Sequence, residues 1–94
     1  MRVRWLAKAL AGLEAELGHI AAEDADAARR IAIVVRERTE SLAQFPESGR
    51  PGRVTGTREL VLAGLPFIIP YRVRGKEVQV LRFFHTSRKP PATW

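Results

Sequence analysis

Gly56 to His85 reads GTRELVLAGLPFIIPYRVRGKEVQVLRFFH, and this stretch decides the fold. Its Val, Ile, Phe and Tyr residues favour strands, and they gather in three runs separated by two short segments. The runs predict strands over Arg58–Ala63, Phe67–Val73 and Val78–Phe84. Because the short segments carry the Gly and Pro of tight turns, the stretch predicts a three-stranded antiparallel meander.

The residues before this sheet predict a short strand followed by two amphipathic helices. Arg2–Trp5 alternates polar and apolar side chains, as an edge strand does. Apolar residues recur at helical spacing over Leu6–Ile20, and Asp24 suits the N-cap of a second helix that runs to about Gln44. Since the link is only a few residues long, the helices form an antiparallel hairpin. The predicted fold is α+β, with the hairpin packed on one face of the meander.

Two proline-containing features interrupt these patterns. Phe45–Gly52 is rich in Pro and Gly, and we expect a loop there. Pro70 lies inside the second predicted strand, where it cannot donate a ladder hydrogen bond. We therefore expect a β-bulge at Pro70, or a position outside the hydrogen-bonded pairs.

The composition is that of one small domain over residues 1–94. Hydrophobic residues make up 46% of the chain, enough for a core, and no cysteine is present for disulfide or thiolate chemistry. No apolar run reaches the roughly 18 residues of a membrane span, and no apolar block of a signal peptide follows the N-terminus. We expect a cytoplasmic protein without a membrane partner.

Positive charge is concentrated in the second half of the chain. Residues 1–47 hold seven Lys or Arg and eight Asp or Glu, a net charge of −1, whereas residues 48–94 hold nine and two, a net charge of +7. Such asymmetry favours a polyanion or an acidic protein as partner, although a charged surface also serves solubility alone. Arg72 and Arg74 share one predicted strand face, and Arg82 lies on the next strand. This patch suits phosphates and acidic side chains alike.

Four strings in order resemble the ParE/RelE toxin superfamily, and the ParE branch most. They are the loop AQFPESGR at Ala43–Arg50, GTREL at Gly56–Leu60, FIIPYRV at Phe67–Val73, and Val78–Arg88 with its Leu81-Arg82 and His85-x-x-Arg88. Together they cover nearly the whole chain. The sequence departs from the family pattern at Leu6 and at Lys89-Pro90-Pro91.

The resemblance implies the toxin of a bacterial type II toxin–antitoxin pair, a class tied to growth inhibition and plasmid maintenance. It also implies a small cognate antitoxin, encoded alongside, that wraps and silences the toxin. The ParE branch is associated with inhibition of DNA gyrase, and the RelE branch with cutting mRNA on the ribosome. We expect no cofactor.

The residues favour the ParE branch over an RNase. RNA cleavage needs a proton-transfer group and cations around the scissile phosphate. The resemblance places Ile68 where the RelE branch carries Arg, and Trp94 near the end where that branch has Tyr or His; an indole N–H cannot act as acid or base. His85 and Arg88 remain as candidate catalytic residues of an RNase.

We therefore expect a gyrase inhibitor that acts by binding, without covalent chemistry of its own. The alternatives are a RelE-like ribosome-dependent endoribonuclease and an inactive relative that retains antitoxin binding. Direct nucleic-acid binding stays open.

Candidate binding residues lie in both halves of the chain. On the hairpin, an amphipathic antitoxin segment would pack on two apolar rows that contain Leu10, Leu13, Leu17, Ile31 and Val35. On the sheet half, the antitoxin or the target would meet Arg58, Arg72, Arg74, Arg82, Arg88 and the aromatic anchor Trp94. For Arg58, an internal ion pair that holds the loop is an equal alternative. His19 has no second ligand at helical spacing, so we expect no metal site.

Overall fold

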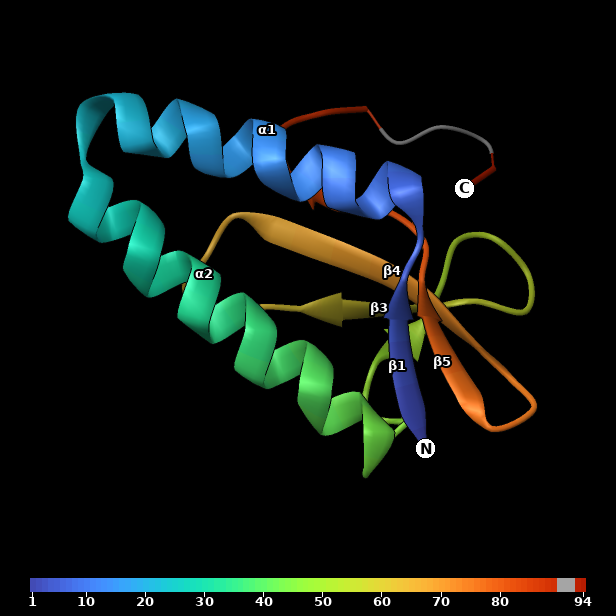
Figure 1. Cartoon of the computed structure of the whole chain (residues 1–94). Coiled ribbons are helices and arrows are strands. Elements are labelled where there is room, and N and C mark those ends of the chain that lie inside the picture. The colour runs from blue at the N-terminus through green and yellow to red at the C-terminus, as the bar shows by residue number, and fades with distance from the viewer. Residues whose placement is uncertain (90–92) are drawn as a thin grey trace.

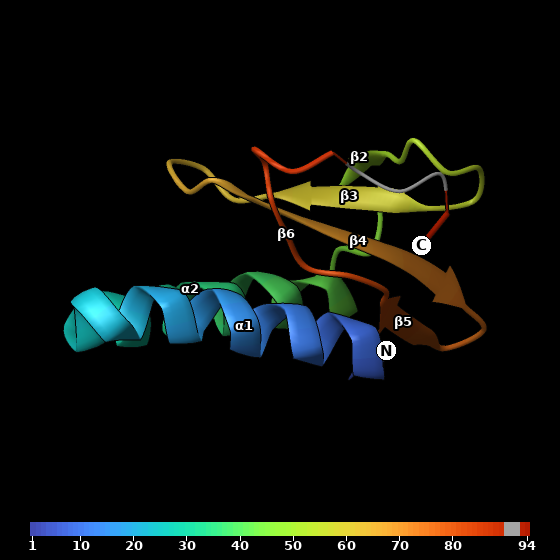
Figure 2. The ribbon, with the colours of Figure 1, turned by 90° about the horizontal axis from the view of Figure 1, so that it is seen from above.

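The computed structural model of the chain describes residues 1–89 and 93–94 and has two layers, a helix hairpin and a mixed sheet (Figure 1, Figure 2). The elements follow in the order β1 Arg2–Trp5, α1 Ala7–Glu23, α2 Ala25–Glu40, the 3₁₀ turn η1 Ser41–Ala43, β2 Arg50–Pro51, β3 Arg58–Val61, β4 Phe67–Arg74, β5 Glu77–Val80 and β6 Phe84–His85. The predicted α+β class, with a short first strand, a helix hairpin and a following meander, is confirmed.

The two helices meet at a single residue, Asp24. Its backbone N–H closes α1 on the Ile20 carbonyl, and its Oδ1 accepts a 3.0 Å hydrogen bond from the backbone N–H of Ala27 in α2. The second helix ends at Glu40, four residues before the predicted end at Gln44. Ser41 Oγ donates a hydrogen bond to the Arg38 carbonyl at 2.6 Å, and the chain leaves the α-helix through the turn η1.

The sheet contains more strands than the predicted meander. Its order is β1-β5-β4-β3-β2, and β6 pairs with β4. The first strand joins β5 in parallel, with Val3 opposite Val78, whereas the other pairs are antiparallel. The two-residue strand β2 lies in the segment predicted as loop and pairs with β3. The sheet therefore has β1 at one edge and β2 at the other.

A register shift opposite Pro70 divides the strand predicted over Val78–Phe84 into β5 and β6. Residues 81–83 lie opposite only two residues of β4, one of which is Pro70. The Pro70 carbonyl accepts a 2.8 Å hydrogen bond from the backbone N–H of Leu81. The bulge expected at Pro70 is therefore present, but the extra residue belongs to the opposite strand.

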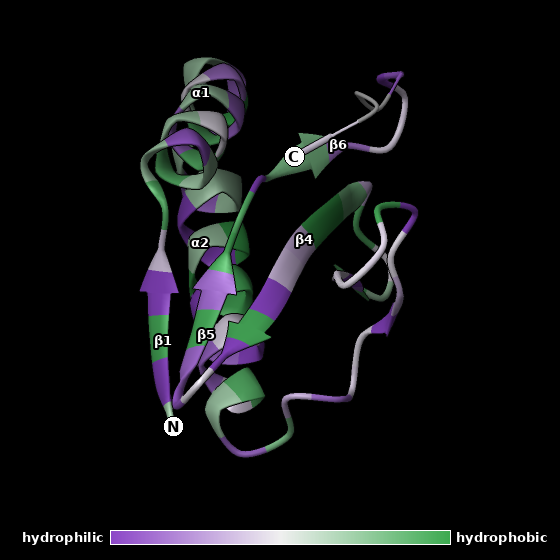
Figure 3. Cartoon of the chain, turned by 90° about the vertical axis from the view of Figure 1, so that its right-hand side faces the viewer, coloured by the Kyte–Doolittle hydropathy of each residue, from purple (hydrophilic) through white to green (hydrophobic). Residues whose placement is uncertain are grey.

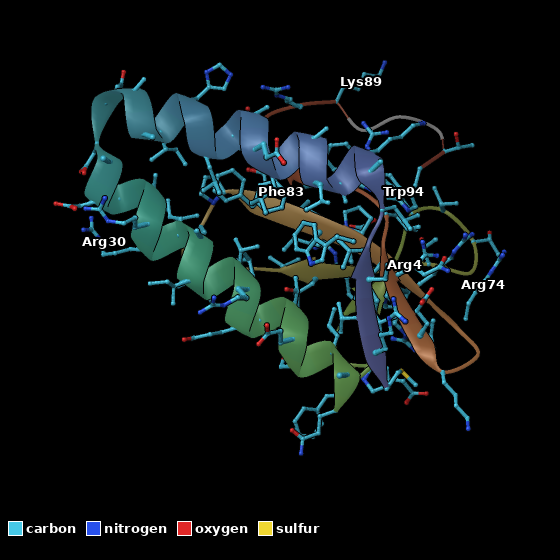
Figure 4. The ribbon with its side chains drawn as sticks, in the orientation of Figure 1. Arg4, Arg30, Arg74, Phe83, Lys89 and Trp94 are labelled. Atoms are coloured by element: carbon cyan, nitrogen blue, oxygen red, sulfur yellow. The ribbon has the colours of Figure 1, made fainter. Side chains whose placement is uncertain are left out.

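The core lies between the hairpin and the inner face of the sheet. Ile69, Tyr71 and Val80 are fully buried there, and Phe83 lies between α1 and the sheet (Figure 4). A Cβ at Gly12 would approach the Phe83 carbonyl oxygen to 2.7 Å. Glycine at this position therefore lets α1 come close to the sheet, which offsets its cost of about 1 kcal/mol in helix propensity.

The opposite side of the sheet, here called the outer face, is not covered by the helices (Figure 2). Hydrophilic and hydrophobic residues alternate along β1 and β5, as Figure 3 shows, because successive side chains point to opposite faces. Arg72 lies opposite Gln79, and Arg74 opposite Glu77, on the outer face. Among the described residues, no helix is long and apolar enough to cross a membrane.

Candidate functional site

Buried contacts hold the Phe45–Gly52 loop against the sheet. The Tyr71 hydroxyl accepts a hydrogen bond from the backbone N–H of Gly49 and donates one to the Pro46 carbonyl, each 2.8 Å long. Arg58 Nη1 donates to the Gly49 carbonyl at 2.8 Å. Arg58 thus holds the loop through a hydrogen bond to a backbone carbonyl, and among the described residues it makes no ion pair of the kind expected from the sequence.

Glu59 anchors the other half of this loop from β3. The residue is 2% exposed, and its carboxylate binds the Arg53 side chain and backbone N–H at 3.0 Å and Arg50 Nη2 at 3.0 Å. Burial raises the pKa of Glu59, but the hydrogen bonds from Arg53 and Arg50 outweigh it and lower the pKa to about 2. The carboxylate is thus ionised at neutral pH, and Arg50 and Arg53 serve the fold.

Arg72 and Arg74 both lie on the outer face of β4, and Arg82 lies in the bulged segment between β5 and β6. Arg72 Nε donates to Gln79 Oε1 at 2.8 Å, and Gln79 Nε2 in turn donates to Glu77 Oε1 at 2.8 Å. Arg74 is exposed at the end of the sheet far from the helix hairpin turn (Figure 4). The Arg82 guanidinium lies 5.1 Å from the Phe84 ring centroid.

Trp94 docks on the outer face. Its indole N–H donates a 3.1 Å hydrogen bond to Thr57 Oγ1, and its ring centroid lies 5.3 Å from that of Phe84. The Arg53 guanidinium lies 6.0 Å from the indole centroid, and Arg82 Nη1 lies 3.5 Å from the Trp94 carbonyl oxygen. The predicted aromatic anchor is therefore half-buried against the chain itself.

His85 and Arg88 make separate contacts. The His85 ring meets the Phe67 ring edge-on, with centroids 5.6 Å apart, and its Nδ1 lies 2.7 Å from the Ser87 hydroxyl oxygen. Arg88 pairs with the buried Glu16 of α1 at 3.1 Å. Arg88 lines one hollow of about 500 Å³ and His85 another of about 500 Å³, and Glu16 lines both. The two candidate catalytic residues thus face different hollows.

Ile68 lies in an apolar strip of the outer face. It pairs with Val61 of β3 on one side and with Phe84 of β6 on the other. Because the Phe84 ring also meets Trp94, this strip runs on to the docked indole. The position where the RelE branch carries a cation is apolar, with apolar neighbours.

The apolar rows predicted on the hairpin largely face the sheet. Val35 is 1% exposed and belongs to the core, and Leu13 and Ile31 pack against that core. Val35 is therefore not available on the surface, because the hairpin turns its main apolar face inward. Leu17 is half-buried, and Leu10 is 43% exposed.

Sequence reasoning missed two exposed apolar residues on α2. Ile33 is 48% exposed and Val34 is 37% exposed. Both lie off the row of inward-facing residues, so a search for one apolar stripe does not find them. A run of consecutive apolar residues, IAIVV at 31–35, was the available signal, because it is wider than one face of a helix. Within the residues that the structure describes, no cluster of His, Cys, Asp or Glu could hold a metal ion.

Known proteins are similar to this chain in sequence and in fold. Residues 3–90 match the family described as the ParE toxin of the type II toxin-antitoxin system, parDE. The protein named Putative toxin Y4kP from Sinorhizobium fredii is 42% identical over 90 residues, which cover 96% of this chain and 93% of that protein. Toxin RelE2 from Caulobacter vibrioides is 37% identical over 87 residues, which cover 93% and 97%.

A solved structure described as the chromosomal ParDE TA system from P. aeruginosa has the same fold. It matches with a TM-score of 0.81 and 34% identity, and the match covers 90% of this chain and 95% of that chain. Family, relatives and fold therefore agree, and the chain belongs to the ParE family of toxins of type II toxin–antitoxin systems.

Proposed function

We propose that this toxin arrests growth by binding DNA gyrase, and that an antitoxin encoded beside it neutralises it. The observation that carries the choice of target is the apolar strip at Ile68, which is flanked by Val61 and Phe84. A scissile phosphate needs cations and a proton-transfer group close by. An isoleucine between apolar neighbours supplies neither of them, and this favours action by binding.

The placement of His85 and Arg88 supports the same choice. An RNase would use both side chains on one phosphate, yet they line different hollows. Arg88 is also engaged by the buried Glu16 at 3.1 Å. Recruiting it to a substrate would leave a buried carboxylate without its ion pair, which is costly.

A second candidate function, ribosome-dependent RNA cleavage, is favoured by one hollow. The hollow that Arg88 lines is also lined by Lys8, Arg82 and Glu16, so that three cations and a carboxylate surround one concave surface. Such a set is compatible with phosphate binding and proton transfer. The similarity to the protein named Toxin RelE2 is a second reason to test this candidate.

Neutralisation by an antitoxin is supported by the exposed apolar residues of the hairpin and by the charge of the outer face. The solved structure with the same fold is that of a ParDE TA system. On this chain, Leu10, Ile33 and Val34 offer apolar contacts, and acidic residues of the antitoxin would pair with Arg72, Arg74 or Arg82.

The test is a supercoiling assay with purified gyrase and the purified toxin, with and without the product of the neighbouring open reading frame. The toxin alone should block supercoiling, and the neighbouring product should restore it. Expression of the toxin alone should also stop growth, which an inactive relative would not do. Full supercoiling at a large molar excess of toxin that still arrests growth would reject gyrase as the target.

A further inference from the structure

A hollow of about 620 Å³ opens beside the docked Trp94. The beginning of α1, the turn after β2, the end of β4 and Trp94 form its walls. A volume of this size is in the range of small-molecule sites in proteins.

The charged residues that line this hollow are all positive. Lys8, Arg72 and Arg74 contribute three cations, and no Asp or Glu is among the lining residues that the structure describes. Glu59 of β3 is occupied by Arg50 and Arg53. Glu77, which lies opposite Arg74, does not line the hollow and pairs with Arg4 at 3.0 Å. Three cations that share one concave, partly apolar surface raise the local positive potential and favour an anionic ligand.

Contacts within the chain hold two of the lining side chains, Arg72 and Trp94, in place before any ligand binds. Gln79 Oε1 accepts from Arg72 Nε at 2.8 Å, which leaves the terminal nitrogens of that guanidinium for a ligand. Trp94 is held by Thr57 at 3.1 Å and by the Phe84 ring. Groups that are held in place before binding lose little conformational freedom when a ligand arrives.

We propose that this hollow is a binding site for a phosphoryl group, either a phosphate monoester or a phosphodiester. Arg72 and Arg74 provide donors in the planar geometry that phosphate accepts, and Lys8 adds a point charge. Thr55 adds a side-chain hydroxyl, and the start of α1, which Leu6 does not cap, adds backbone N–H donors. The proposal rests on the three cations Lys8, Arg72 and Arg74. Phosphate binding at this hollow is independent of whether gyrase is the target.

The test is an NMR titration of the full-length chain with inorganic phosphate at pH 7 and fixed ionic strength. The indole N–H signal of Trp94, identified by its loss in Trp94→Phe, reports on the hollow, and that of Trp5 serves as the internal reference. Saturable movement of the Trp94 signal is expected, with little movement of Trp5. Sodium acetate at the same ionic strength should not saturate it, because a carboxylate cannot engage all three cations at once.

A pair of double variants separates this site from general electrostatics. Arg72→Gln with Arg74→Gln removes two cations that line this hollow, whereas Arg30→Gln with Lys76→Gln removes two exposed cations that do not line it. Figure 4 shows Arg30 and Arg74 at opposite ends of the molecule. The first double variant should raise the Kd for phosphate about tenfold or more, and the second should leave it within about twofold.

Two further probes distinguish the source of the phosphate. Adenosine monophosphate offers a monoester, and a short single-stranded oligodeoxynucleotide with hydroxyl ends offers only diesters. Tighter binding of either one than of inorganic phosphate supports the site and identifies its ligand. Three results overturn the proposal: no saturable movement of the Trp94 signal with any phosphate, saturation by acetate at the same Kd, or equal weakening in both double variants.

Discussion

The hydroxyl of Tyr71 accepts a 2.8 Å hydrogen bond from the backbone N–H of Gly49, which lies 22 residues earlier in the chain. A strand in the centre of the sheet thus fixes the loop that carries the first family string. A Cβ at Gly49 would lie 2.6 Å from both the Tyr71 ring and its hydroxyl, so only glycine fits there. Gly49 belongs to the loop string that resembles the family, and its role in this chain is to hold the loop against the sheet.

Tyr71→Phe should lower the free energy of unfolding by about 1–3 kcal/mol, because it leaves a buried N–H of Gly49 and the Pro46 carbonyl without their partner. Urea unfolding followed by circular dichroism measures the change. Gly49→Ala should destabilise the fold at least as much. A Tyr71→Phe protein as stable as the parent chain would show that water replaces the hydroxyl.

Glu59 should make the free energy of unfolding depend on pH in the acid range. Because its folded pKa of about 2 lies below the ordinary value of 4.5, its contribution is present above pH 4.5 and is lost as the pH falls towards 2. The contribution is about 3 kcal/mol, since one pKa unit corresponds to about 1.4 kcal/mol. Glu59→Gln should be less stable at pH 7 and should lose less stability than the parent chain between pH 4.5 and 2. If the free energy of unfolding fell equally in both proteins between pH 4.5 and 2, the role of this carboxylate would be contradicted.

Two glycines of α1 form a matched pair with opposite expected effects. Gly18→Ala should stabilise the fold by about 0.5–1 kcal/mol, since nothing lies within 4 Å of the added Cβ and alanine favours helix. Gly12→Ala should destabilise it, because its Cβ would approach the Phe83 carbonyl oxygen to 2.7 Å. Thermal unfolding of both variants measures whether each substitution raises or lowers the stability. Stabilisation by Gly12→Ala would show that α1 can move away from the sheet.

The exposed residues of α2 should contribute to antitoxin binding. Ile33→Ser with Val34→Ser should weaken the complex with the neighbouring gene product about tenfold or more, while the fold is retained, because both side chains are already exposed. Calorimetric titration measures the Kd. The control, Ala21→Ser with Ala22→Ser, changes two exposed residues of α1 in the same way and should bind like the parent chain. Equal affinity for all three proteins would place the antitoxin elsewhere.

The sequence predicted the elements whose pattern is local. Helical spacing from Leu6 and the cap at Asp24 located both helices, and strand-forming runs located β3, β4 and β5. The parallel pairing of β1 with β5 could not be read from the pattern, because it joins residues far apart in the chain, such as Val3 and Val78. The two-residue strand β2 is too short to show any period.

For the candidate site, the sequence predicted the face on which a charged residue lies more readily than the residues that it contacts. A basic patch at Arg72 and Arg74 followed from strand alternation, and the structure places both on the outer face. The pattern could not tell that Arg58 binds the Gly49 carbonyl, or that Trp94 docks on Phe84, because such contacts depend on the folded chain. Val35 was misplaced because amphipathic spacing identifies a stripe without saying what covers it.

The most direct test of a toxin that acts by binding gyrase compares two products in parallel: cleaved DNA trapped by gyrase and cut mRNA on translating ribosomes. The wild-type toxin and the His85→Ala, Arg88→Ala double variant, confirmed as folded, are assayed at equal concentrations. Both proteins should trap cleaved DNA or block supercoiling, and both should leave ribosome-bound mRNA intact. Site-specific mRNA cuts by the wild-type toxin that disappear in the double variant, with gyrase unaffected by either protein, would contradict this account.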